Sequence, residues 1–561
     1  MKRPEKQQDS RQRALLSAIL LCLGLLIFLP TLGITKIIDP SDGFFAETAR
    51  EMLESGNFVA PTLNYQAWND KPILNHWLVA LSYALFGVSE YTSRLPAALC
   101  AIALCITTFI FSSRFLGRKT AFYAALMLLS SYLFQILGRV SLTDMPLALF
   151  VNLGLFSLFS GLVTNNRRET WVGWGALGLA FLTKGPISIL IVIGVFSLYF
   201  LATTPNVSVR ELITQFKKMN VSKGLLLVLA IAAPWFIVAG IVSNGRVLYD
   251  FFIVQNVQRA SGTLVLNHEQ PFWFYLPLLA LAVFPFTALA PASVPVVRKW
   301  WQKRHCGSLR IKFLLFCGAF CITILGGFSL LKGKLPTYIL PLVPSLCLIL
   351  TAGINEALRA KQRLATMIGG ATAAVASITA IFVFPKSIEA TGSALLLAQG
   401  LMIAYIGTSL AFIVAALSKH RAFALSQMIT VCVLVTAILI PFVFVEFYEL
   451  HQLDYANILQ SGMSKKGTLS QVGDTSPSAP FYAHKEIPRI RTFFDLAATT
   501  AYKGDHYVIA KSEYADFLSH APIRKLIDKR GEWTLYQIGD PDQTLLNAYY
   551  TLERVKAQSR R

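Results

Sequence analysis

Acidic side chains that can do chemistry appear first in the stretch DPSDGFFAETAREM, directly after a long apolar run. Asp39 and Asp42 stand close together there, and paired carboxylates at such a spacing predict a general base or a metal site. The structural interpretation is that Asp42 or Ser41 caps the helix that follows, while Glu47 is solvated. The spacing alone leaves both interpretations open.

A second group of stretches carries cations where a phosphate would need them. NDKPILNHW places Asp70 and Lys71 just before an apolar helical pattern, and the amide groups at a helix start would add to the lysine charge. QNVQRASGTLVLNHEQPFWFYL supplies Arg259, whose guanidinium can hold a phosphate through two hydrogen bonds. The same stretch holds His268, which suits metal binding or proton transfer. A surface ion pair of Asp70 with Lys71 and a structural His268 are the plainer alternatives.

Two further stretches put charged residues at the ends of apolar runs. GRVSLTDMPLALF contains Asp144, which either caps a helix or forms an ion pair with Arg139. LTKGP places Lys184 at the end of a spanning pattern. A lone lysine at that position often only extends its ammonium group into the interfacial water.

The stretch KGKLPTYILPLVP combines two lysines with an apolar run. Lys332 and Lys334 either anchor a helix end or hold an anion. Pro336 fits the first turn of a helix, whose free N–H groups would then face the same place. Tyr338 adds a hydroxyl one turn further along.

Composition predicts a membrane protein that crosses the bilayer many times. Hydrophobic residues make up 54% of the 561 residues and charged residues only 14%, with a mean hydropathy of +0.54. Apolar runs of about 20 residues match the roughly 30 Å of bilayer hydrocarbon. The net charge of +21 is spread over short loops, which argues against a nucleic-acid-binding protein.

Thirteen spanning helices are predicted, and the basic loops between them alternate with loops that hold acidic, histidine and aromatic residues. By the positive-inside rule the N-terminus is cytoplasmic and the C-terminus lies outside. The helices are centred near Leu25, Ala103, Leu128, Leu153, Leu177, Ile193, Leu229, Ala282, Leu325, Leu346, Ala374, Ile406 and Val435. Residues 1–447 thus form a transmembrane domain with amphipathic helices in the outer loop 38–94, and residues 448–561 form a soluble α/β domain.

All the candidate residues fall on the outer face. Cations that converge at the bilayer edge suit an anionic ligand whose tail stays in the lipid, such as a lipid phosphate or diphosphate. A flippase or transporter would place charges at mid-membrane and often shows internal symmetry, and no internal repeat is evident. The pattern favours an enzyme over a transporter.

The motifs in order, DPSDGFFAETAREML, DKPI, TDMP, FLTKGP, HEQPFWFYLP and KGKLPTYILP, resemble membrane glycosyltransferases of the GT-C type. Within these they look most like the family that moves 4-amino-4-deoxy-L-arabinose from undecaprenyl phosphate to lipid A, related to protein O-mannosyltransferases. The resemblance implies a bacterial inner-membrane enzyme with a periplasmic C-terminal domain and an inverting transfer. A different sugar, or an acceptor that is another glycan or a protein, fits the same motifs.

The resemblance also implies roles for individual residues. A carboxylate in the first outer loop would act as base, either Asp42 or Asp39, because the family pattern of two consecutive acids is altered here. Asp144 is the second acid. The implied ligands of the donor phosphate are Lys71, Arg259 and Tyr338, with Lys184, Lys332 and Lys334 as further pocket cations. A divalent metal such as zinc would bind at Asp70 and His268.

Overall fold

The computed structural model describes residues 2–205, 208–259, 269–284, 286–305, 307–359, 406–407, 421–492, 495–496, 505–518 and 523–538. These residues form two compact units. Unit 1 comprises 1–34, 57–60 and 69–443, and unit 2 comprises 35–56, 61–68 and 444–561. Part of the first outer loop therefore groups with the C-terminal residues.

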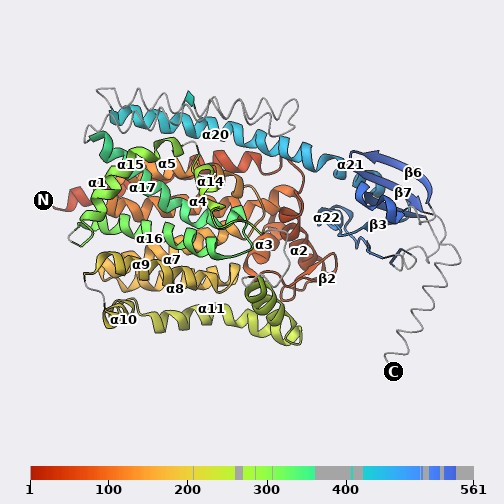
Figure 1. The fold of residues 1–561 in the computed structure, drawn as a ribbon, viewed down its shortest axis with the longest axis horizontal. Coiled ribbons are helices and arrows are strands. Elements are labelled where there is room, and N and C mark those ends of the chain that lie inside the picture. Colours follow the sequence, from red (N-terminus) through yellow and green to blue (C-terminus); the bar gives the residue numbers. More distant parts are fainter. Residues whose placement is uncertain are drawn as a thin grey trace. The chain divides into compact units, whose positions relative to one another are not determined.

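Unit 1 is built from helices, most of which Figure 1 shows in red to green, with the part of α20 (Arg421–His451) that belongs to it in cyan. The long helices are α1 (Lys2–Phe28), α4 (Glu90–Leu116), α5 (Arg118–Leu129), α7 (Asp144–Thr164), α8 (Arg167–Lys184), α9 (Ile187–Thr203), α11 (Val221–Val242), α16 (Leu309–Leu330) and α17 (Val343–Arg359). Shorter elements are η1 (Leu29–Thr31), α3 (Leu74–Phe86), α6 (Tyr132–Leu137), α10 (Val209–Lys218), α12 (Arg246–Leu248), the π-helix η2 (Tyr249–Gln258), α14 (Tyr275–Ala282), η3 (Phe286–Leu289), α15 (Ala290–Gln302) and η4 (Pro336–Leu342).

Close packing of α7 on α8 brings two chain-distant ends together, and Figure 1 shows these helices running side by side. Gly154 and Gly173 allow the two helices to come close together. A Cβ added to Gly154 would lie 2.8 Å from the side chain of Leu177, and a Cβ added to Gly173 would lie 3.0 Å from the carbonyl oxygen of Gly154. Small residues allow such backbone approach between membrane helices. Because α7 and α8 are antiparallel neighbours, the first residue of α7 and the last residue of α8 meet at one end.

Six helices among the described residues are long and apolar enough to cross a membrane, or seven if α20 (Arg421–His451) and α21 (Leu453–Met463) form one bent span. α3 and α9 are shorter apolar helices. The predicted helices centred near Ala374 and Ile406 fall in 360–420, of which only residues 406–407 are described. A polytopic helical membrane protein is therefore evident, and the number of thirteen spans stays a prediction.

Unit 2 contains a mixed five-stranded sheet in the order β4-β3-β5-β7-β6. Its strands are β3 (Thr468–Val472), β4 (Arg489–Ile490), β5 (His506–Lys511), β6 (Ile523–Arg530) and β7 (Trp533–Ile538). β3 pairs in parallel with β4 and β5, whereas β7 pairs antiparallel with β5 and β6. The run HYVIAK is β5, and the run WTLYQI is β7. The other elements of the unit are α2 (Ser41–Ser55), the hairpin β1 (Thr62–Leu63) and β2 (Gln66–Ala67), α21, α22 (Ser478–Ala483), η5 (Ser512–Tyr514) and α24 (Ala515–Leu518).

Most of the helix α2 is buried, including charged side chains that would face water on an amphipathic surface helix. Glu47 is fully buried, so the expectation that it is solvated is wrong. Arg50, one turn later, donates to both Glu47 oxygens at 2.7 and 2.8 Å and to Glu54. A charged pair can be buried in this way because each charge has a partner and its hydrogen bonds are satisfied.

Candidate active site

The end of unit 1 where α7 begins and α8 ends holds an ion pair. Lys184 Nζ lies 2.8 Å from Asp144 Oδ1, and the side chains are only 14% and 8% exposed. The ammonium also lies over the ring of Tyr338, 4.6 Å from its centroid. Lys184 is the last residue of α8 and is followed by Gly185, whose φ of +80° ends the helix. The packing of α7 on α8 therefore fixes the position of this lysine.

Two predictions about Asp144 are wrong. The residue is not the N-cap of α7, because Thr143 holds that position and Asp144 is in the first turn. Nor does it pair with Arg139, which is 2% exposed and donates instead to the carbonyl of Ile27 and the hydroxyl of Thr31. Arg139 thus joins the segment after α6 to the end of α1.

A second group of charges joins the loop before α3 to the π-helix η2. Lys71 Nζ lies 2.7 Å from Asp70 Oδ2, and the guanidinium of Arg259, directly after η2, lies 3.9 Å from Asp70 Oδ1. Asn69 donates to Asp250 at 2.9 Å, which ties the loop to the start of η2. Asp70 and Lys71 lie before α3, as predicted, because that helix begins at Leu74.

The two groups form one electrostatic cluster. Burial would by itself raise the pKa of Asp70, but attraction to Lys71, Arg259 and Lys184 outweighs it and holds that pKa below the ordinary value. Burial together with the repulsion of Arg259 and Lys184 lowers the pKa of Lys71, and Asp70 opposes this. Three cations thus face two carboxylates, Asp70 and Asp144. The excess of one positive charge makes the cluster suited to bind an anion.

The lysines of the loop between α16 and η4 behave differently from each other. Lys334 is 4% exposed and donates to two backbone carbonyls, that of Gln270 at 2.7 Å and that of Leu331. It therefore fastens its loop to the segment before α14. Lys332 is exposed to solvent. Pro336 is the first residue of η4, as predicted, and Tyr338 on η4 reaches Lys184.

The two candidate bases lie in unit 2. The Asp39 carboxylate accepts hydrogen bonds from the backbone N–H of Ser478, at 2.9 Å, and from its hydroxyl. Burial raises the pKa of Asp39 from 3.8 to about 7, against the effect of those hydrogen bonds. Asp42 is fully buried in the first turn of α2 and accepts from the N–H of Ile38 at 3.3 Å. The N-cap of α2 is Pro40, so capping by Asp42 or Ser41 is wrong.

The predicted metal ligands are described only in part, because His268 lies outside the described residues. Among the described residues, no group of three potential ligands gathers. Asp70 is held by Lys71 and Arg259, so a metal at Asp70 would require these cations to turn away. Zinc binding at Asp70 and His268 stays a prediction.

Three residues that contribute to this region were not predicted from the sequence. Asn69 and Asp250 make the bond that positions Asp70, and the hydroxyl of Tyr275 donates to the carbonyl of Leu335 at 3.2 Å beside Tyr338. π-helices occur often at functional sites, but the sequence of η2 carries no signal that separates it from an α-helix. Asn69 directly precedes the DKPI motif, and this position is the sequence feature that could have indicated its role.

Comparison with known proteins finds similarity to transferases named for lipid-linked sugar donors. The model for the family described as dolichyl-phosphate-mannose-protein mannosyltransferase matches residues 70–238. A relative from Shewanella sediminis, named undecaprenyl phosphate-alpha-4-amino-4-deoxy-L-arabinose arabinosyl transferase, is 28% identical over 66% of this chain and 66% of its own length. A relative from Proteus mirabilis with the same name and the suffix 2 is 30% identical over 62% of this chain and 61% of its own length. The chain thus spans just under two thirds of each of these relatives.

A solved structure is similar over nearly the whole chain. The crystal structure of ArnT from Cupriavidus metallidurans bound to undecaprenyl phosphate covers 93% of this chain and 97% of that chain, with a TM-score of 0.73 and 20% identity. The likeness shows the fold, and a helical GT-C-type membrane architecture is confirmed. The resemblance inferred from the motifs is confirmed as well. An inner-membrane protein that crosses the bilayer several times follows from the same comparisons.

Proposed function

We propose that this protein is an inverting glycosyltransferase that moves 4-amino-4-deoxy-L-arabinose from undecaprenyl phosphate to lipid A at the periplasmic face of the inner membrane. The curated relatives carry the name of that transferase, and the similar solved structure holds undecaprenyl phosphate. The N-terminus is cytoplasmic in this proposal, thirteen helices span the membrane, and the domain 448–561 is periplasmic.

The observation that carries the proposal is the cationic cluster of unit 1. Lys71, Arg259 and Lys184 come from three separate segments and surround two carboxylates, which leaves one positive charge in excess. As the glycosidic bond to the carrier breaks, negative charge develops on the departing phosphate. Fixed cations that wait for this charge lower the barrier, because they need not reorganise during the reaction.

The cations have distinct parts in the proposed step. Arg259 would bind two phosphate oxygens through its guanidinium, and Lys71 would supply a single charged donor. Asp70 pairs with both Lys71 and Arg259, and the bound anion would replace part of this pairing. Asp144 holds Lys184 toward the ring of Tyr338, whose hydroxyl is a further donor to the phosphate.

A carboxylate of the first outer loop would accept the proton of the acceptor hydroxyl as it attacks the anomeric carbon. Asp42 is the proposed base, and Asp39 is the alternative. The contacts of Asp39 with Ser478 favour Asp42, because both Asp39 oxygens already accept hydrogen bonds within unit 2. A divalent cation held by Asp70 and His268 would add positive charge near the departing phosphate, and elemental analysis of the purified protein tests for zinc.

The proposal is tested by transfer of labelled sugar from purified undecaprenyl phosphate-aminoarabinose to lipid A. We expect product with the wild-type protein and a loss of at least a hundredfold in Asp42→Asn. Lys119→Ala, which removes an exposed lysine of α5, serves as the control and should keep full activity. Mass spectrometry of lipid A from cells with and without the gene gives a second readout.

Two outcomes contradict different parts of the proposal. Transfer of another sugar from the same carrier, with none of aminoarabinose, would retain the chemistry but reject the substrate. Full activity of Asp42→Asn and of Asp39→Asn would reject both assignments of the base.

A further inference from the structure

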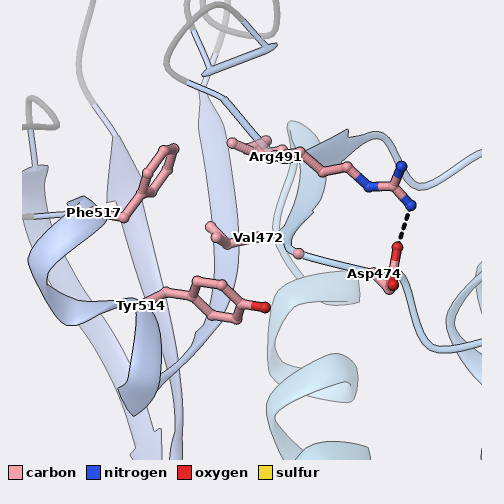
Figure 2. A pocket seen from close by; sticks show the side chains of 7 residues that line it. Val472, Asp474, Arg491, Tyr514 and Phe517 are labelled. Carbon is pink, nitrogen blue, oxygen red and sulfur yellow. Dashed lines mark hydrogen bonds and ion pairs between the residues drawn. The ribbon is translucent and has the colours of Figure 1, made fainter. Parts of the chain in front are cut away.

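The sheet of unit 2 carries a cavity that the transfer reaction does not use. The cavity has a volume of about 340 Å³. Its lining residues, shown in Figure 2, are Val472, Gly473, Asp474, Ile490, Arg491, Tyr514 and Phe517. A volume of this size lies at the small end of the range of about 300–1,000 Å³ found for small-molecule sites.

The position of the cavity follows from the topology of the sheet. Val472 ends β3, Arg491 directly follows β4, and Tyr514 lies in η5 directly after β5. These three strands are parallel, so their carboxyl ends meet at one edge. Ligands of open α/β sheets bind in the crevice outside the carboxyl ends of the parallel strands.

One side of the cavity is charged. Arg491 Nη2 contacts Asp474 Oδ1, and Arg489 Nη1 lies 3.9 Å from the same oxygen. The Arg491 side chain is 60% exposed and thus open to a ligand. The Nε of Arg489 is buried, with no hydrogen-bond partner in the part of the chain that the structure describes. Asp495 accepts from the backbone N–H of Arg491 at 2.9 Å, so two carboxylates lie near the two guanidinium groups. The exposed guanidinium of Arg491 is the lining group that can bind an anion.

Aromatic side chains complete the lining. Tyr514 packs close to Gly473, which has a φ of +80° and whose added Cβ would lie 2.6 Å from the tyrosine hydroxyl. Phe517 follows on α24 and lines the same cavity. Aromatic faces pack well against the C–H face of a sugar ring, while a guanidinium and a carboxylate side by side can donate to and accept from ring hydroxyls.

We propose that this cavity is a binding site for a phosphorylated saccharide. The aromatic side chains contact the sugar ring, and Arg491 binds the phosphate through two hydrogen bonds. The site is separate from the cationic cluster of unit 1, and the inference does not depend on the transfer activity. The same chemistry is present in a free sugar phosphate and in the phosphorylated head group of a glycolipid.

Titration calorimetry on the full-length protein in detergent tests the site, with saturating undecaprenyl phosphate present to occupy the cluster of unit 1. The probes are glucosamine 1-phosphate, glucosamine and inorganic phosphate. We expect glucosamine 1-phosphate to bind at least tenfold more tightly than either of the others. Arg491→Ala and Phe517→Ala should each weaken it at least tenfold, and Arg491→Lys less, because lysine keeps the charge but not the paired donors.

The matched control is Arg530→Ala. Arg530 is an exposed arginine of β6 that lies 3.5 Å from Asp528 and does not line the cavity, so its removal should leave the affinity unchanged. Thermal unfolding of each variant checks that the fold is intact. Equal binding of inorganic phosphate, no binding of glucosamine 1-phosphate, or wild-type affinity in both Arg491→Ala and Phe517→Ala would overturn the proposal.

The source of the saccharide is resolved by competition. Lipid A in nanodiscs that displaces glucosamine 1-phosphate in an Arg491-dependent way supports a glycolipid head group as the occupant. Binding of the soluble probe that lipid A does not displace supports a free sugar phosphate.

Discussion

Removal of both partners of the Lys184–Asp144 pair should destabilise unit 1 by less than the sum of the two single removals. The side chains are 14% and 8% exposed and their charged atoms lie 2.8 Å apart. Loss of one partner of a buried pair costs about 3–5 kcal/mol, and the small remaining exposure places Lys184→Ala and Asp144→Ala near the lower limit, at about 3 kcal/mol each. Both variants leave a charge that water barely reaches.

The double variant should lose much less than the sum, because neither charge then remains unpaired. Residues in one ion pair show coupling energies of about 0.5–3 kcal/mol, and burial places this pair near about 2 kcal/mol. The exposed pair Arg13–Asp9, with side chains 40% and 38% exposed, is the control and should show a coupling of about 0.5 kcal/mol or less.

The assay is reversible unfolding of the purified protein in mixed micelles, with the four members of each cycle measured together. Donor use is measured in parallel. The double variant should lose less stability than the two single losses added together, and it should not regain transfer, since Lys184 is a proposed phosphate ligand. Additive losses in the cycle would refute the pairing. Recovery of transfer in the double variant would refute the role of Lys184.

Three further predictions concern other charged groups. Lys71→Ala should raise the KM for the lipid-linked donor about tenfold to a hundredfold, because one charge-assisted hydrogen bond is lost. Lys71→Arg should restore part of the affinity. An unchanged donor KM would contradict the proposed role of Lys71 as a phosphate ligand. Lys334→Ala should lower the unfolding temperature and leave the donor KM of the folded fraction unchanged, because Lys334 donates to two backbone carbonyls. An unchanged unfolding temperature with a raised donor KM would instead indicate that Lys334 is a phosphate ligand. Asp39 has a folded pKa of about 7 against an ordinary 3.8, so the folded state keeps a proton that the unfolded chain releases, and its contribution to stability falls as pH rises from about 4 to 7. The unfolding temperature of Asp39→Asn minus that of the wild type should therefore increase as the pH rises from about 4 to 7. A difference that does not change with pH would argue against the raised pKa of Asp39.

The membrane architecture and the strands of unit 2 could be predicted from the sequence because they depend on local patterns. Apolar runs of bilayer length cannot remain in water, and the run HYVIAK has a strand composition that suits the sheet centre, where β5 lies. Pro336 at the first turn of η4 was likewise local, since its fixed φ suits a helix start. The set of candidate cations also came from the sequence, as charges placed beside apolar segments.

Their partners were decided by tertiary structure. Arg139 is five residues from Asp144 and was the natural partner by sequence, yet the antiparallel packing of α7 on α8 brings Lys184 to Asp144 from forty residues away. Lys334 resembled Lys332 in the sequence, but only Lys334 is buried against carbonyls of another segment. Glu47 looked solvated and is enclosed with Arg50. Sequence spacing fixes which residues share one helix face, whereas burial and pairing depend on contacts between elements, which no local pattern encodes.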